Sequence, residues 1–165
     1  MVELAVSLSR RHVAYIGVTR EDKAAGAARE DGFRAGLKSE GTELEDKYVR
    51  ISAFRAESGY EAVLTLLKEE NDIDVISCAT DTIAAGAIRA LRAQGMNPAP
   101  AAENPGIIVT GFGDNQLLKA ATGGIPTVHF GYKTSGIRSA ELLLDVIERG
   151  EKIPIEMKLG FRLIE

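Results

Sequence analysis

The chain has 165 residues, 45% of them hydrophobic and 27% charged, which fits one soluble globular domain with its own core. Twenty basic and 24 acidic residues give a net charge of −4. This charge argues against direct binding of DNA or RNA by this segment, because free-standing nucleic-acid binders are usually basic. The single cysteine, Cys78, excludes an internal disulfide, and its apolar surroundings predict a buried, inert thiol.

Strand and helix patterns alternate along most of the chain. Residues 1–11 are typical of the back half of a helix that runs into a strand, so we expect the chain to be part of a longer protein. Neither a signal peptide nor a membrane span is predicted. We expect strands at 12–17, 48–54, 74–79, 107–110, 127–130 and 155–163. We expect helices at 22–40, 58–70, 82–94, 115–122 and 135–149, a capping box formed by Ser58 and Glu61, and a loop at 97–105.

This alternation predicts an α/β fold with a doubly wound parallel sheet and right-handed crossovers. Ligands of such sheets bind beyond the carboxyl ends of the strands. The side chains expected there offer aromatic, hydroxyl, carboxylate and guanidinium groups: Thr19, Arg20, Phe54, Arg55, Thr80, Asp81 and residues 111–115. Aromatic faces combined with fork-shaped donors and acceptors suit a sugar. The sequence therefore predicts a polar small-molecule site at this edge.

The helix at 82–94 is apolar on two faces, and only Arg89 is charged between Ile83 and Leu91. One face can lie on the chain's own sheet, so we expect the other to need a partner. The sequence thus predicts a homodimer contact on this helix, carried by Ile83, Ala84, Ala87, Ile88 and Leu91.

Motifs for catalysis, metals and cofactors are weak. Gly111-Phe-Gly113 begins like a dinucleotide fingerprint, but Gln116 stands in the place of the third glycine. No spacing predicts a metal site, and we expect neither metal nor cofactor. Asp81 and Asp114 would suit acid/base catalysis, yet helix capping or binding of ligand hydroxyls explains them equally well. No nucleophile is evident, and the favoured interpretation is that the chain is not an enzyme.

Several short motifs occur in a fixed order along the chain. They are residues 28–37 (Ala-Arg-Glu-Asp-Gly-Phe-Arg-Ala-Gly-Leu), Phe54 with 57–60 (Glu-Ser-Gly-Tyr), Ala79-Thr-Asp81 with Ala85-Gly-Ala87, Thr110-Gly-Phe-Gly113 and Pro126-Thr-Val128. Together they resemble the effector-binding domain of the lactose/galactose-repressor (LacI/GalR) family of bacterial transcription regulators. The likeness covers nearly the whole chain but only about half of a family member.

The resemblance implies a periplasmic-binding-protein-like fold, in which two lobes clamp a sugar or another metabolite. Residues 1–125 and 153–165 look like the second, C-terminal lobe. Residues 126–152 would cross to the first lobe and pack on it, and without that lobe Ile137, Leu144 and Ile147 would be partly uncovered. The DNA-binding domain of the family has no counterpart in this chain.

The resemblance also implies effector contacts, position by position. Arg29 matches the arginine that grips ligand oxygens, and Phe54 the aromatic residue that stacks on the ligand. Thr80 and Asp81 match the pair that binds ligand or caps the helix. Gly113 stands where the family has an aspartate, so Asp114 is only a candidate for the fourth contact. The alternatives are a solvated Arg29 and core packing of Phe54. The sequences Ala-Thr-Asp-Thr at 79–82 and Gly-Phe-Gly at 111–113 are similar to those of disaccharide-responsive members, such as trehalose or sucrose repressors.

By this resemblance the chain is the sensing part of a cytoplasmic, sugar-responsive regulator, a repressor that binds a sugar or sugar phosphate. Effector binding would act through a homodimer on operator DNA, which only the absent N-terminal domain contacts, and no membrane partner is expected. Alone, this half of the clamp should bind sugar weakly. Two alternatives stay open: a solute-binding receptor of the same fold, and an α/β enzyme acting on a phosphosugar.

Overall fold

The computed structural model describes residues 12–99, 106–150 and 154–164. Within these residues, helices and strands alternate nearly as the sequence predicts. The strands are β1 (Val13–Val18), β2 (Val49–Ser52), β3 (Val75–Cys78), β4 (Pro98–Ala99), β5 (Ile107–Thr110), β6 (Thr127–Phe130) and β7 (Phe161–Ile164). The helices are the π-turn η1 (Lys23–Ala28), α2 (Arg29–Ser39), the 3₁₀ turn η2 (Asp46–Tyr48), α3 (Ala56–Glu69), α4 (Asp81–Ala93), α5 (Gln116–Thr122) and α6 (Tyr132–Arg149). The predicted helix end at 1–11, and residues 100–105 of the predicted loop, lie outside the described residues.

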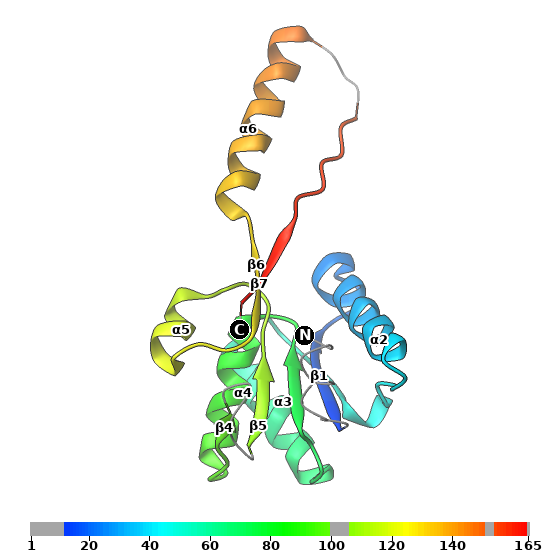
Figure 1. The fold of residues 1–165 in the computed structure, drawn as a ribbon, viewed down its shortest axis with the longest axis vertical. Coiled ribbons are helices and arrows are strands. Elements are labelled where there is room, and N and C mark those ends of the chain that lie inside the picture. Colours follow the sequence, from blue (N-terminus) through cyan, green and yellow to red (C-terminus); the bar gives the residue numbers. More distant parts are fainter. Residues whose placement is uncertain (1–11, 100–105, 151–153, 165) are drawn as a thin grey trace.

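The body of the molecule is a parallel sheet with the strand order β2-β1-β3-β5-β4. Helices α3 and α4 cover one face, and α2 lies on the other face beside β1 (Figure 1). This is the doubly wound α/β lobe that the sequence predicts. Parallel strands are buried on both faces, which explains why all six residues of β1 and all four of β3 are buried.

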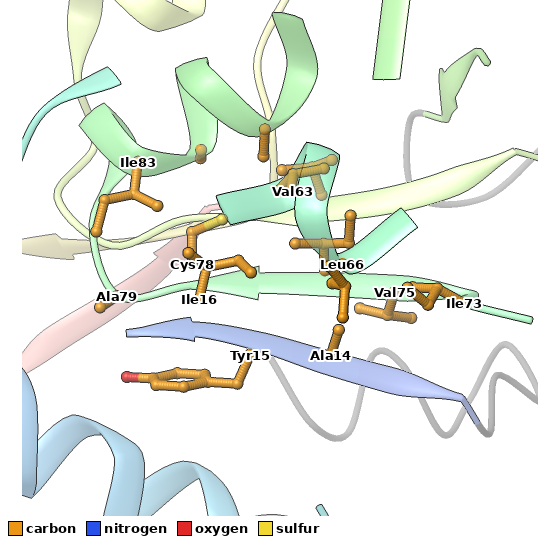
Figure 2. Packing of buried hydrophobic residues seen from close by; sticks show 14 of the residues in the cluster. Ala14, Tyr15, Ile16, Val63, Leu66, Ile73, Val75, Cys78, Ala79 and Ile83 are labelled. Atoms are coloured by element: carbon orange, nitrogen blue, oxygen red, sulfur yellow. The ribbon is translucent and has the colours of Figure 1, made fainter. Parts of the chain in front are cut away.

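The core lies mainly between the sheet and the α3–α4 pair. Figure 2 shows Ile16, Cys78, Leu66 and Ile83 gathered there, whereas the Tyr15 ring points to the other side of β1, towards α2. Cys78 is buried as predicted, and burial raises the pKa of its thiol, which keeps the sulfur protonated and inert.

Helix starts and ends follow local chemistry. Thr80 caps α4, because its side-chain oxygen accepts the Ile83 N–H at 3.2 Å, and Asn115 caps α5 in the same way. The predicted capping box at Ser58 is wrong. Helix α3 begins earlier, with Arg55 at its N-cap position, and the Ser58 hydroxyl instead bonds the backbone of Ala53 and Arg55 from inside the first turn.

The predicted dimer face of α4 is corrected by the structure. All five residues assigned to it are buried inside this chain at 0–3% exposure, because α3 covers the second apolar face of the helix: Ile83, Ala84, Ala87, Ile88 and Leu91. The two helices cross closely at two glycines. A Cβ added to Gly86 would lie 2.0 Å from the Ala56 carbonyl oxygen, and one on Gly59 would lie 2.7 Å from that of Ile83.

Beyond β6 the chain leaves the body. Helix α6 and the returning segment 154–160, which we call the arm, project away from the sheet and re-enter through β7 (Figure 1). No residue of α6 is buried, and Ile137, Leu144 and Ile147 are 48%, 57% and 67% exposed, which confirms that they lack cover in this chain. None of the described helices has the length and apolarity needed to cross a membrane.

The last strand differs from its prediction. Only Phe161–Ile164 forms a strand, and it pairs antiparallel with β6 rather than joining the main sheet. The apolar residues of the alternating pattern are all exposed rather than half-buried: Met157, Leu159, Phe161 and Leu163. The predicted half-burial of this alternating pattern is therefore not found within the described residues.

Candidate functional site

A cavity of about 660 Å³ lies between α2, the carboxyl ends of β3 and β5, and the β6–β7 pair. This volume is within the range of small-molecule sites, about 300–1,000 Å³. Its walls carry four phenylalanines from different parts of the fold: Phe33, Phe112, Phe130 and Phe161. The cavity is at the strand edge where the sequence predicts a site, and it presents aromatic faces to an occupant.

Arg29, the first residue of α2, provides the cationic group of this cavity. Its guanidinium donates to the Ala79 carbonyl at the end of β3, and its central carbon lies 4.0 Å from the centroid of the Phe112 ring. Burial lowers the pKa of Arg29 relative to a free arginine, but a guanidinium stays charged at neutral pH. Within the described residues its remaining donors have no acceptor. Arg29 is thus held in place with donors left for ligand oxygens.

Three aromatic rings next to Arg29 form a continuous cluster. The Phe112 and Phe130 centroids are 4.7 Å apart, and Tyr132 meets Phe130 edge-on at 5.7 Å. The Tyr132 hydroxyl donates to the Gly113 carbonyl at 3.0 Å. These contacts join the loop after β5 to the start of the arm.

A row of hydroxyl-bearing residues crosses the sheet face towards α2. Tyr15, Ser77 and Thr110 are in register on β1, β3 and β5, and Thr110 donates to Ser77 at 3.0 Å. The Tyr15 ring stacks on Phe33, and burial raises the pKa of its hydroxyl. That buried hydroxyl has no hydrogen-bond partner within the described residues. It is an unsatisfied donor in the wall of the cavity.

Of the five predicted effector residues, only Arg29 lines this cavity. Phe54 lies between β2 and α3, half exposed and outside the lining of the cavity. Thr80 is occupied as the cap of α4. Both residues keep their predicted place beyond strand ends, but the structure does not bring them into contact with Arg29.

Asp81 is placed as a structural residue rather than as a ligand contact. It is 3% exposed, and its two carboxylate oxygens accept from the Asn115 N–H and the Thr127 hydroxyl, both at 2.6 Å. The prediction left helix capping and ligand binding open for this residue. Its carboxylate does not cap α4 but ties the loop after β5 and strand β6 to the start of that helix, and its part in ligand binding stays a prediction.

Asp114 also points away from the large cavity. Its Oδ2 lies 2.8 Å from Nδ1 of His129, and its φ of 52° makes it the only described non-glycine residue with a positive φ. Asp81 and Asp114 both line a smaller cavity of about 210 Å³ behind the loop, where each carboxylate already has protein partners. This arrangement leaves neither aspartate as a free acid or base.

Sequence reasoning missed Tyr15 and Phe130 of the cavity wall, and Tyr132, which packs on Phe130. It placed Phe112 at this strand edge within residues 111–115 but did not name it as a contact. Phe112 stood in a recognised motif, but its flanking glycines drew the interpretation towards a turn. Phe130 and Tyr132 flank Gly131 at the end of a predicted strand, and an aromatic residue at each side of a strand exit was the signal that was available.

The chain is similar to known proteins over nearly its whole length. Residues 4–161 match the family described as periplasmic binding proteins and sugar binding domain of LacI family. The HTH-type transcriptional regulator CelR of Thermobifida fusca is 28% identical over 87% of this chain, and RegA of Clostridium saccharobutylicum is 26% identical over 98%. A structure of the CelR–cellobiose complex superposes with a TM-score of 0.88 at 27% identity, over 99% of this chain and 48% of that one.

The chain spans about half the length of these curated relatives, 41% of CelR and 47% of RegA. The family match and the parallel lobe agree with the predicted resemblance in both sequence and fold. The chain belongs to the family of periplasmic binding proteins and LacI-type sugar-binding domains.

Proposed function

We propose that this chain is the effector-sensing part of a sugar-responsive bacterial transcription regulator. The observation that carries the proposal is Arg29 among the phenylalanines in the wall of the 660 Å³ cavity: a fixed guanidinium for hydroxyls beside aromatic surfaces for a sugar ring. The CelR relative was solved with cellobiose, which favours a disaccharide as the effector class. The regulator would act in the cytoplasm, where its operator DNA is.

The exposed arm supports a two-lobed arrangement. The body and β7 would form the second lobe, and residues 126–152 would cross to a first lobe outside this chain. The arm offers that lobe an apolar surface, since Leu143, Leu144 and Ile147 are each more than half exposed. Sugar closing the two lobes would change the operator affinity of a helix-turn-helix domain, also outside this chain, by a coupling of about 1–3 kcal/mol.

Sugar binding by the isolated chain tests the site. Titration calorimetry with cellobiose is expected to give weak binding, with a Kd of about 1 mM, because half of the clamp is absent. Arg29→Ala should abolish the signal, and Arg29→Lys should not restore it, because lysine lacks the planar fork. Arg92→Ala, an exposed arginine on α4, is the matched control. Micromolar binding, or binding that survives Arg29→Ala, would contradict this assignment.

We also propose that the regulator is a homodimer, with the contact moved to the outer side of α4 and the start of α5. There Arg89 stacks on Tyr60 at 4.2 Å, Ala85 is half-buried, and Leu117 is 82% exposed. Burial of this aliphatic side chain, next to the Arg89–Tyr60 stack, would favour association with a second copy of the chain.

Sedimentation velocity tests the revised contact. Leu117→Glu should shift the chain towards monomer, because a buried carboxylate without a partner opposes association. Ile51→Glu is the control, an equally aliphatic exposed residue on β2 at the opposite edge of the sheet. Equal association of both variants and the unmodified chain would refute the interface at Leu117.

A further inference from the structure

The loop after β5 and the strand β6 are bonded to each other along their length. The backbone N–H of Gly111 donates to the Pro126 carbonyl, and that of Gly113 donates to the Val128 carbonyl, each at 2.9 Å. The Asp114 N–H adds a 3.3 Å bond to the Thr127 hydroxyl. Residues 111–114, directly after β5, are thus joined to β6 and the residue before it by backbone hydrogen bonds.

Two carboxylates fasten the same pair of segments through side chains. Asp81 anchors both to α4, as described above. The Asp114–His129 pair joins the loop to the second half of β6 by a side-chain hydrogen bond, next to the Phe112–Phe130 ring contact, and it is largely shielded, with 14% of the Asp114 side chain and 29% of that of His129 exposed. Asp114 makes this contact from a positive φ, which aspartate adopts more readily than most residues other than glycine and asparagine.

This junction lies between the cavity and the arm. Phe112, at the centre of the loop, touches Arg29 on one side and Phe130 on the other. Helix α6 begins two residues after Phe130, at Tyr132, whose hydroxyl returns to Gly113. A displacement of Phe112 can therefore reach the first turn of α6 over a short path, through the neighbouring Gly113 and its hydrogen bond with Tyr132.

We propose that the Asp114–His129 pair is a latch that makes residues 111–115 and β6 move as one piece, and so transmits the position of Phe112 to α6. The regulatory use of the latch rests on the proposed function, since an effector in the cavity would set Phe112. The latch itself can be tested without any sugar, so its failure and a failure of sugar binding are distinguishable.

Amide hydrogen exchange of the full 165-residue chain is the test. Asp114→Gly removes the carboxylate while the backbone keeps its positive φ, which glycine adopts freely. If the latch holds the two segments, exchange should rise about tenfold in both the loop and β6, while α3 and α4 stay unchanged. If Asp114 contributes only its backbone conformation, the same variant should leave exchange unchanged or slow it, because glycine adopts a positive φ more readily. Asp114→Asn should stay near the unmodified chain, because asparagine accepts positive φ and keeps an oxygen for His129.

His129→Leu removes the other half of the latch and should reproduce the effect of Asp114→Gly. Transmission is measured with Phe112→Ala, which frees the loop from Arg29. In the latched chain this change should speed exchange in the first turn of α6, and in the His129→Leu background it should add no further increase there. Loosening of the loop without β6, or an equal effect of Phe112→Ala in both backgrounds, would overturn the proposal.

Discussion

Replacing Asp81 by alanine is expected to lower the free energy of unfolding by about 3 kcal/mol, because a buried hydroxyl and a partly buried N–H lose their charged acceptor at once. The Asn115 N–H and the Thr127 hydroxyl, each 2.6 Å from an Asp81 oxygen, would be left unpaired. The space next to Gly111 would also open, since a Cβ at that glycine would lie 2.1 Å from Asp81 Oδ1. Urea unfolding followed by circular dichroism measures the change.

Asp46→Ala is the matched control for this result. Its carboxylate is 93% exposed and pairs only with Arg34, so the loss should stay within about 0.5 kcal/mol. Asp81→Asn should fall between the two, because one oxygen remains as an acceptor. A stable Asp81→Ala chain that had lost all sugar binding would return this residue to the role of ligand contact that the sequence left open.

Gly86→Ala is expected to cost about 3 kcal/mol, or to prevent folding, because the added methyl would overlap the Ala56 carbonyl and the Tyr60 amide nitrogen of α3. Backbone atoms cannot move aside as a flexible side chain does, so the two helices would have to separate. That separation would open the core around Ile83, which α3 seals. Thermal or urea unfolding of the purified chain measures the loss.

Gly32→Ala, at a second helical glycine, is expected to raise stability rather than lower it. Nothing lies within 4 Å of a Cβ at Gly32, so alanine there should add about 0.5–1 kcal/mol by restricting the unfolded chain. If both alanine variants had the same stability, the close approach of α3 and α4 would be wrong.

Much of the fold was predictable because it depends on local pattern. The first five predicted strands, a helix cap at Thr80 or Asp81 and the uncovered residues of α6 follow from apolar spacing and capping chemistry within a few neighbours. The family resemblance, carried by short motifs in order, is confirmed by the match over residues 4–161.

The contacts of the site were harder to predict, because they join residues that are far apart in the sequence. Asp81 bonds Thr127 across 46 positions and Asn115 across 34, and nothing near Asp81 in the sequence indicates either partner. The predicted dimer contact on α4 was wrong for a related reason. Periodicity shows how many faces of a helix are apolar but not which element covers them. Gly59 and Gly86 were the missed signs that another helix of the same chain approaches closely.

Because β6 pairs with β7, the arm begins and ends at neighbouring positions on the body. Phe130 and Phe161 face each other across an antiparallel pair, so the chain leaves the body and returns to it at almost the same point. Partners in such a pair have Cα atoms about 5 Å apart, a gap that a two-residue turn closes. The lobe therefore needs no part of residues 131–160 for its own chain connectivity. An Asn-Gly turn in their place would give a self-contained single-lobe scaffold with Arg29, Phe112 and Phe130 still in the same wall.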